Sequence, residues 1–190
     1  MVLPPGEAAK AKRAKGTVST YTNAPLNPLG ETMQHLVDSQ VSAFPHAAVK
    51  LQFFECMVRY AAFFQARPQS IGAVLPPFLD ERGLHHARAG VRHRVNYLFF
   101  RLINATRAVI SPEFVRGVLE RIQDLLVIEA ELPSVLEGED PLERAMDVVG
   151  TIDSQLNLFE ASGIMLASLR QSPETQVALL RVSVCAQKLP

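Results

Sequence analysis

A helical pattern that occurs twice, 42 residues apart, limits what this chain can fold into more than any other feature of its sequence. In each copy, apolar residues recur at i, i+4, i+7, i+8 and i+11, the spacing of one face of an α-helix. The first copy contains Val49, Phe53, Cys56, Met57, Tyr60, Phe63 and Phe64. The second copy contains Val91, Val95, Leu98, Phe99 and Leu102. We expect both faces to be packed in a core.

A proline after each copy divides the pattern into pairs of helices. Arg67-Pro68 and Ser111-Pro112 each end one helix and open the next, because proline restricts the residue before it and is tolerated in a first turn. A third pair is predicted from Asp153, as an N-cap, and from Ser172-Pro173. Helix pairs that recur every 40 to 47 residues are typical of HEAT and armadillo arrays. The sequence therefore predicts an all-α fold, an α-α superhelix (HEAT-repeat solenoid) of about three antiparallel helix pairs.

Composition sets the expected boundaries of this array. Residues 1–29 are poor in large apolar side chains and are predicted to form a flexible arm before a HEAT-repeat segment at 30–181. The third repeat is longer than the others, and the extra residues are rich in acids, proline and glycine. They predict an inserted acidic loop at 131–150. Residues 182–190 leave the helical pattern and are expected to form an irregular tail.

Charge is segregated along a chain whose 19 basic and 19 acidic residues balance. No acid lies between Glu81 and Glu113, whereas six arginines do, and from Glu113 to Asp153 eleven acids face three arginines. Within the basic part, Arg88 and Arg92 share one helical face, and Arg94 and Arg101 share another. Guanidinium groups bind phosphates, so these four residues are candidate nucleic-acid contacts. The alternative is a ladder of ion pairs with acids of adjacent helices.

The residue types that carry catalysis do not occur in a recognisable arrangement. His85, His86 and His93 are close in sequence, but they lack the i, i+4 spacing of ligands on a helix, so no metal site is predicted. No nucleophile motif or phosphate-binding glycine loop is present. We therefore expect no enzyme, no catalytic residue and no cofactor. Two isolated cysteines favour a reducing, intracellular compartment, and no apolar run reaches the length of a membrane span.

Three stretches of the chain resemble the middle HEAT repeats of the exportin-T family, which belongs to the importin-β superfamily. They are the run from Phe78 to Leu126, FLDERGLHHARAGVRHRVNYLFFRLINATRAVISPEFVRGVLERIQDLL; the run DSQLNLFEASGIMLASL at 153–169; and LQFFECMVRYAAFF at 51–64. The similar residues are co-linear with the family over roughly 31–180. Their helices coincide with those that periodicity predicts.

The resemblance implies a transport receptor rather than a catalyst. Receptors of this family bind tRNA together with Ran in its GTP state, carry it through the nuclear pore in contact with pore proteins, and release it in the cytoplasm. By this resemblance the chain is a fragment of such a receptor, shuttling between nucleus and cytoplasm without insertion into a membrane. The alternative interpretation is a stand-alone HEAT scaffold that binds proteins, with the acidic loop as its docking site and no RNA.

Overall fold

The computed structural model describes residues 26–127, 141–169 and 173–185 of the chain. These residues form α-helices and short 3-10 helices, and no strand occurs among them. In chain order the elements are α1 (Pro28–Asp38), η2 (Gln40–Ala43), α2 (Ala47–Arg59), α3 (Ala62–Ala66), η3 (Pro68–Ser70), α4 (Ile71–Leu79), α5 (Ala89–Thr106), α6 (Pro112–Ile122), η4 (Gln123–Leu125), α7 (Pro141–Ser168) and α8 (Pro173–Cys185). Within the described ranges, every helix is too short or too polar to cross a bilayer. The all-α prediction is confirmed.

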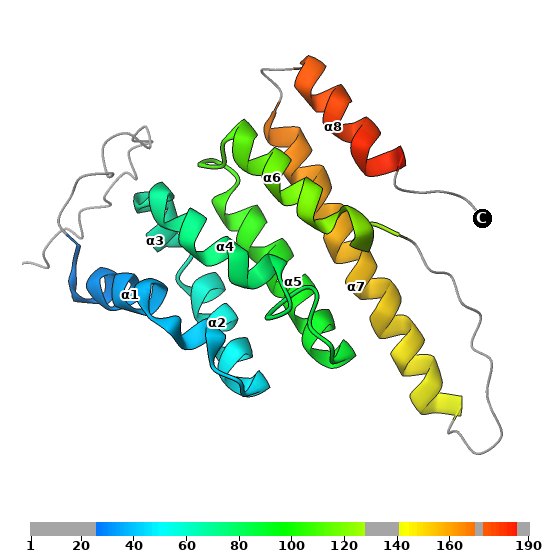
Figure 1. Ribbon diagram of the computed structural model, residues 1–190, viewed down its shortest axis with the longest axis horizontal. Coiled ribbons are helices and arrows are strands. Elements are labelled where there is room, and N and C mark those ends of the chain that lie inside the picture. The colour runs from blue at the N-terminus through cyan, green and yellow to red at the C-terminus, as the bar shows by residue number, and fades with distance from the viewer. Residues whose placement is uncertain (1–25, 128–140, 170–172, 186–190) are drawn as a thin grey trace, which may run out of the picture.

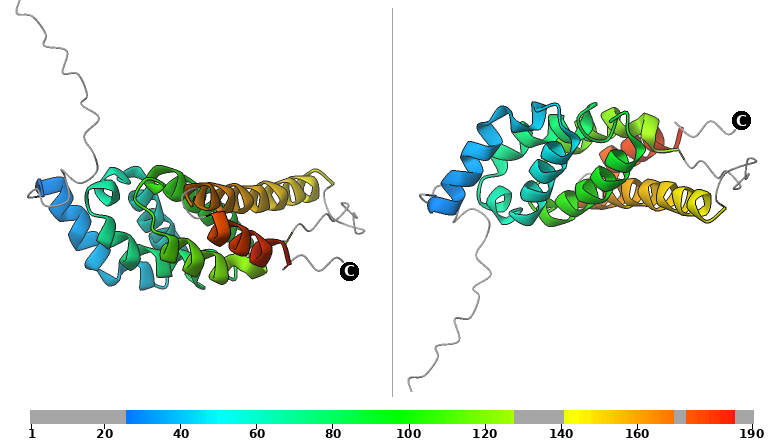
Figure 2. Two further views of the ribbon diagram at one scale, coloured as in Figure 1. Left: turned by 90° about the horizontal axis from the view of Figure 1, so that it is seen from above. Right: turned by 90° about the horizontal axis from the view of Figure 1, so that it is seen from below.

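The helices lie in two layers that advance together along the long axis of the molecule (Figures 1 and 2). One layer contains α2, α5 and α7, with α5 packed against both of the others. In the other layer, α1, α4, α6 and α8 pack each against the next. Stacked pairs of this kind, α2/α4, α5/α6 and α7/α8, are the arrangement of a HEAT-repeat solenoid. The predicted superhelix of about three pairs is confirmed, and α1 precedes the first pair.

An N-cap side chain followed by proline begins two of these helices. The Ser111 hydroxyl accepts a hydrogen bond from the Phe114 N–H (3.2 Å), and Pro112 occupies the first position of α6. In α1, Asn27 Oδ1 accepts from the Gly30 N–H (2.8 Å) in the same way. Both devices satisfy backbone donors that the first turn leaves free. Because α1 begins at Pro28, the last two residues of the predicted arm are helical; residues 1–25 of that arm lie outside the described part.

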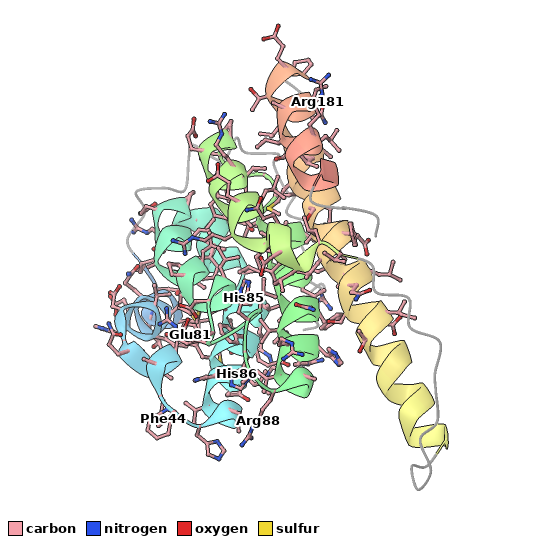
Figure 3. All side chains as sticks on the ribbon, turned by 45° about the vertical axis from the view of Figure 1, so that its right-hand side comes forward. Phe44, Glu81, His85, His86, Arg88 and Arg181 are labelled. Atoms are coloured by element: carbon pink, nitrogen blue, oxygen red, sulfur yellow. The ribbon has the colours of Figure 1, made fainter. Side chains whose placement is uncertain are left out.

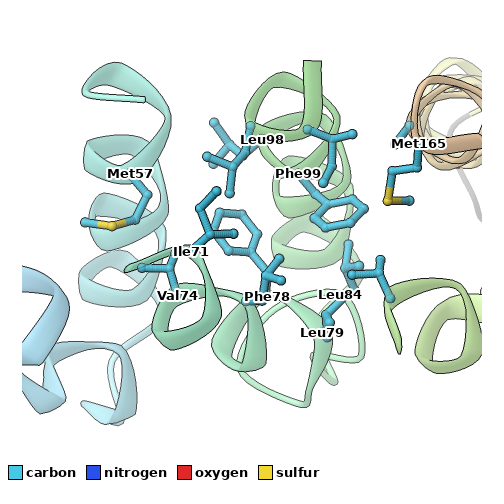
Figure 4. Packing of buried hydrophobic residues seen from close by; sticks show 14 of the residues in the cluster. Met57, Ile71, Val74, Phe78, Leu79, Leu84, Leu98, Phe99 and Met165 are labelled. Carbon is cyan, nitrogen blue, oxygen red and sulfur yellow. The ribbon is translucent and has the colours of Figure 1, made fainter. Parts of the chain in front are cut away.

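Three phenylalanine rings connect the first pair of helices to the second. Phe78 of α4 packs against Phe54 of α2, with ring centroids 4.3 Å apart, and against Phe99 of α5 at 6.1 Å. All three side chains are completely buried. Figure 4 shows Phe78 and Phe99 among apolar residues from α2, α4, α5 and α7. Burial of such large apolar surfaces is the main term that holds neighbouring repeats together.

The predicted helix over 47–66 is divided into α2 and α3. Tyr60, with φ −106° and ψ 30°, leaves the α-helical region, and the chain resumes as a helix at Ala62. Phe53 and Met57 before the break and Phe63 and Phe64 after it are all buried in the core. The predicted apolar face is therefore kept, although the helix that carries it is not continuous.

The long helix α7 corrects the prediction for the acidic segment. Residues 141–150, expected in the loop 131–150, are helical, and Asp153 lies inside α7 rather than at its start. Pro141 opens α7, where proline is tolerated, and glutamate is a good helix former, so an acidic composition does not exclude a helix. Figure 1 shows the start of α7 extending beyond the other helices. Residues 131–140 lie outside the described part.

The C-terminal pair also differs from prediction at its end. Helix α8 continues to Cys185, so residues 182–185 of the predicted tail are helical, and 186–190 lie outside the described part. In this pair Leu156, Val177 and Leu180 are exposed by 55%, 48% and 42%, whereas Leu158 and Leu179 are buried. A sequence stripe shows that a helix is amphipathic, whereas the face that packs depends on its neighbours.

The loop between α4 and α5 is fixed to the repeats on both sides of it. Arg82 donates to Asp80 within the loop, and its Nη1 reaches Ser42 Oγ (3.3 Å) in η2. The hydrogen bond to Asp80 raises the pKa of Arg82 above its ordinary value. On the other side, His85 lies 2.8 Å from the Leu79 carbonyl oxygen through Nδ1 and 3.0 Å from Asp124 Oδ2 through Nε2. The loop thus connects the segment before the first helix pair with the end of the second pair along one edge.

Gly83 allows this loop to lie directly on the end of α4. The Leu84 N–H donates to the Phe78 carbonyl (2.7 Å), which brings the backbone at Gly83 against the same turn. A Cβ at Gly83 would lie 2.4 Å from the Phe78 oxygen and 2.7 Å from the Pro77 oxygen. Backbone atoms cannot yield as a flexible side chain does, so only glycine fits here.

We predict that Gly83→Ala destabilises the protein by about 1–3 kcal/mol, the usual cost of forcing an extra methyl group into a packed site. The matched control is Gly117→Ala in the middle of α6, where a Cβ meets nothing within 4 Å. That change should stabilise the protein by up to about 1 kcal/mol, because alanine is the better helix former. Urea unfolding measures both. Equal stability of Gly83→Ala and the unmodified chain would contradict the loop packing described here.

Candidate nucleic-acid interface

Two of the four candidate arginines lie on the exposed face of α5. Arg94 and Arg101 flank Tyr97, with guanidinium carbons 5.3 Å and 5.7 Å from the ring centroid. Arg101 Nη1 also donates to the Tyr97 hydroxyl (2.7 Å). Arginine over an aromatic face is a cation–π contact, which holds the charged group without neutralising it. This part of α5 presents a positively charged surface with an aromatic ring at its centre.

Arg94 has a second partner that Arg101 lacks. Its Nε donates to Glu55 Oε1 of α2 (2.8 Å), and Nη2 of the same guanidinium contacts the same oxygen. An ion pair between neighbouring helices is what the ladder interpretation predicts. Arg94 thus fits both interpretations, whereas Arg101 contacts a neutral hydroxyl. Partly exposed pairs of this kind contribute at most about 1 kcal/mol to stability.

The other two candidates lie at the start of α5, beside the α4–α5 loop. Arg92 Nη1 donates to the carbonyl oxygens of His86 (2.8 Å) and Ala87 (2.9 Å), so this half-buried side chain holds the loop in place. Arg88 is the N-cap residue of α5 and is exposed. Figure 3 shows His85, His86 and Arg88 following one another along this edge. The four arginines therefore occupy two places. Arg94 and Arg101 lie on the exposed face of α5, and Arg88 and Arg92 lie beside the α4–α5 loop, at what we call the loop edge.

Lys50 and His86 also belong to the loop edge, although the spacing of the arginines in the sequence does not point to them. Burial lowers the pKa of His86 below its ordinary value of 6.5, and the nearby charges of Lys50, Arg88 and Arg92 lower it further. The Arg88 N–H donates to His86 Nδ1 (3.0 Å), so the neutral ring carries its proton on Nε2. The repeat period could have placed Lys50 at this edge. Lys50 stands 42 residues before Arg92, and residues one repeat apart lie in neighbouring helices.

His85, His86 and His93, which are close in sequence, each have a different set of neighbours in the structure. His85 contacts a carbonyl and Asp124, and His86 accepts from a backbone N–H. His93 faces Gly150 of α7, where a Cβ would lie 3.5 Å from Nδ1. Among the described residues, no group of three or more His, Cys, Asp or Glu side chains is placed to hold a metal ion.

Comparison with known proteins shows a match to a protein family over nearly the whole chain. The family model described as Exportin-T matches residues 3–185. Exportin-T of Mycosarcoma maydis is 48% identical over 182 residues, 95% of this chain, and Exportin-T of Laccaria bicolor is 39% identical over 173 residues, 90% of the chain. Exportin-T of Homo sapiens is 38% identical over 153 residues, 80% of the chain. The chain belongs to the exportin-T family.

The match covers only a part of each relative. The chain spans 16% of the length of the Mycosarcoma maydis and Laccaria bicolor proteins and 15% of the human protein. It therefore corresponds to a segment of an exportin-T, and the stacked helix pairs described above are the architecture of that segment.

We predict that lowering the pH below about 6.5 destabilises the protein through His86. The pKa of His86 is lowered in the folded protein, so the unfolded chain binds the proton first, and the free energy of unfolding falls until the folded state is protonated too. His86→Asn, which does not titrate, should lose less stability between about pH 7.5 and 5.5. Thermal unfolding at several pH values measures this. Lys50→Gln should show an intermediate slope, and parallel curves for all three proteins would contradict the prediction.

Proposed function

We propose that this chain is part of a nuclear export receptor that binds tRNA and carries it from the nucleus to the cytoplasm. The observation that carries the proposal is the similarity to Exportin-T over nearly the whole chain. Such a receptor binds and releases its cargo without changing it chemically, so the proposal includes no enzymatic activity. Transport through the nuclear pore implies contact with pore proteins and a location on both sides of the nuclear envelope.

Ran in its GTP state is the proposed partner that makes tRNA binding cooperative, and hydrolysis of the GTP is the proposed signal for release. Both proposals concern the whole receptor, of which this chain is a segment. Cooperative binding means that each ligand raises the affinity of the other by the same factor. The segment described here contributes cargo contacts in this scheme.

The distribution of arginines supports a role in holding RNA. Arg88, Arg94 and Arg101 are exposed, and no acid occurs in the sequence from Arg82 to Pro112. Double-stranded RNA is recognised mostly through its shape, its phosphates and its 2′-hydroxyl groups, and guanidinium groups are suited to phosphates. We propose Arg88, Arg92, Arg94 and Arg101 as tRNA contacts, with Arg92 acting also as a support for the loop.

We predict that reversing the charge of the exposed arginines, in Arg88→Glu, Arg94→Glu and Arg101→Glu combined, weakens tRNA binding by about tenfold or more. The slope of log affinity against log salt should fall by about three, because each phosphate that the protein no longer neutralises lowers the slope by about one. Fluorescence anisotropy with labelled tRNA at several salt concentrations measures both. The matched control replaces the same three residues with lysine, which keeps the charge and should retain most of the binding.

Two outcomes of this experiment would overturn the assignment. If the unmodified chain does not bind tRNA, the segment does not hold cargo, and a protein-binding HEAT scaffold becomes the better interpretation. If the chain binds tRNA and the glutamate variant binds equally well, the arginines serve only as structural ion pairs. Circular dichroism of each variant establishes that weaker binding does not arise from unfolding.

A further inference from the structure

In the part of the chain that the structure describes, the positive side chains of the loop edge have no acidic partner, whereas Arg94 on the face of α5 has one. Arg94 is paired with Glu55, whereas each charged group that acts on His86, among the described residues, is positive. Within the described part, no hydrogen bond or ion pair holds the Lys50 ammonium or the Arg88 guanidinium. Three like charges placed around one ring repel one another, so this edge gains more from an added anion than a neutralised surface does.

Hydrogen bonds hold part of the loop edge in place. Arg92 is held by two carbonyl oxygens, which fix its position but leave its charge uncompensated. His86 is held by the Arg88 N–H, and the loop itself is fixed to Ser42 on one side and to Asp124 on the other. Groups that are already in position lose little conformational freedom when a ligand binds. A phosphate would therefore meet Arg92 and His86 in place, and its binding would order the Lys50 and Arg88 side chains.

Repeat geometry explains why these residues meet. Lys50 and Arg92 occupy the same position in successive copies of the helical pattern, and so do His46 and Arg88, the N-cap residues of α2 and α5. Because α2 and α5 pack side by side in one layer, equivalent positions form a column along the edge. The basic residues are thus arranged in the direction in which the array advances, as an extended polyanion would require.

We propose that Lys50, His86, Arg88 and Arg92 form a phosphate-binding site for the backbone of the RNA cargo. The proposal rests on the proposed function for the nature of the ligand and adds Lys50 and His86 to the contacts. The charges of Lys50 and Arg88 attract the phosphate, and Arg92 supplies a positive charge that the His86 and Ala87 carbonyls hold in place. The Nε2–H of neutral His86 is a further donor that does not depend on protonation.

The test compares two double variants that each remove two positive charges. Lys50→Gln with Arg88→Gln changes the loop edge, and Arg116→Gln with Arg121→Gln changes exposed arginines of α6 in the other layer. Anisotropy with labelled tRNA should show that the first pair lowers the salt slope by about two and the affinity by about tenfold or more. The second pair should leave the slope within about half a unit of that of the unmodified chain. Equal effects of both pairs would overturn the site, because they would reflect total charge alone.

A second measurement separates failure of this site from failure of the proposed function. In ¹H–¹⁵N spectra of the full chain, inorganic phosphate should shift the backbone amides of residues 86–92 and leave those of α6 unchanged. Phosphate shifts without tRNA binding would support the site and overturn the RNA function. Binding of tRNA, with no phosphate-induced shift at residues 86–92, would support the RNA function and overturn the site. Binding of poly-glutamate as tight as that of tRNA, abolished in the same double variant, would identify an acidic protein as the ligand and overturn the assignment to RNA.

Discussion

The packing of the Phe78 ring is the contact on which the rest of the array depends. This ring lies between Phe54 of the first helix pair and Phe99 of the second, and the Phe78 carbonyl accepts the hydrogen bond that fixes the following loop. In a solenoid, no helix pair buries its apolar face alone, so stability comes from contacts between neighbours. The same residue therefore holds two repeats together and sets the position of the basic edge.

Much of the fold could be predicted from the sequence because each repeat carries its own local signals. The spacing of Val91, Val95 and Leu98 fixes a helix and its buried face, and Pro112 after Ser111 fixes where the next helix begins. These signals operate within a few residues and do not depend on tertiary contacts. Where the structure differs, the local signals were missing or misleading: the spacing of the apolar residues does not mark the break at Tyr60, and α7 continues through a segment whose composition resembles a loop.

The positive charge of the candidate site could be predicted from the sequence, but the residues that lie next to its arginines and histidine could not. The absence of acids between Glu81 and Glu113 marks the basic surface in the sequence. The partner of Arg94, however, is Glu55, 39 residues away along the chain, and the neighbour of His86 is Lys50, which is almost as distant. Only the stacking of α2 on α5 brings them together. A repeat period applied to charged residues as well as to apolar ones would have placed Lys50 beside Arg92.

A row of stacked helix pairs presents its polar surfaces as long, regular edges. On the edge that carries the α4–α5 loop, Lys50, Arg88 and Arg92 form no ion pair with an acid among the described residues, and each lowers the pKa of His86. Such a surface suits a large polyanion that is recognised through its backbone rather than through its bases. Of the groups on this surface, Arg92 and the α4–α5 loop are held in place by hydrogen bonds within the protein.

Photo-crosslinking of the chain to tRNA, followed by mass spectrometry of the crosslinked peptides, tests this account most directly. We predict that the crosslinks fall in two segments that are far apart in sequence and adjacent in the array, residues 46–59 and 82–107. Crosslinks confined to α6 and α8, or an equal distribution over all exposed basic residues, would contradict it.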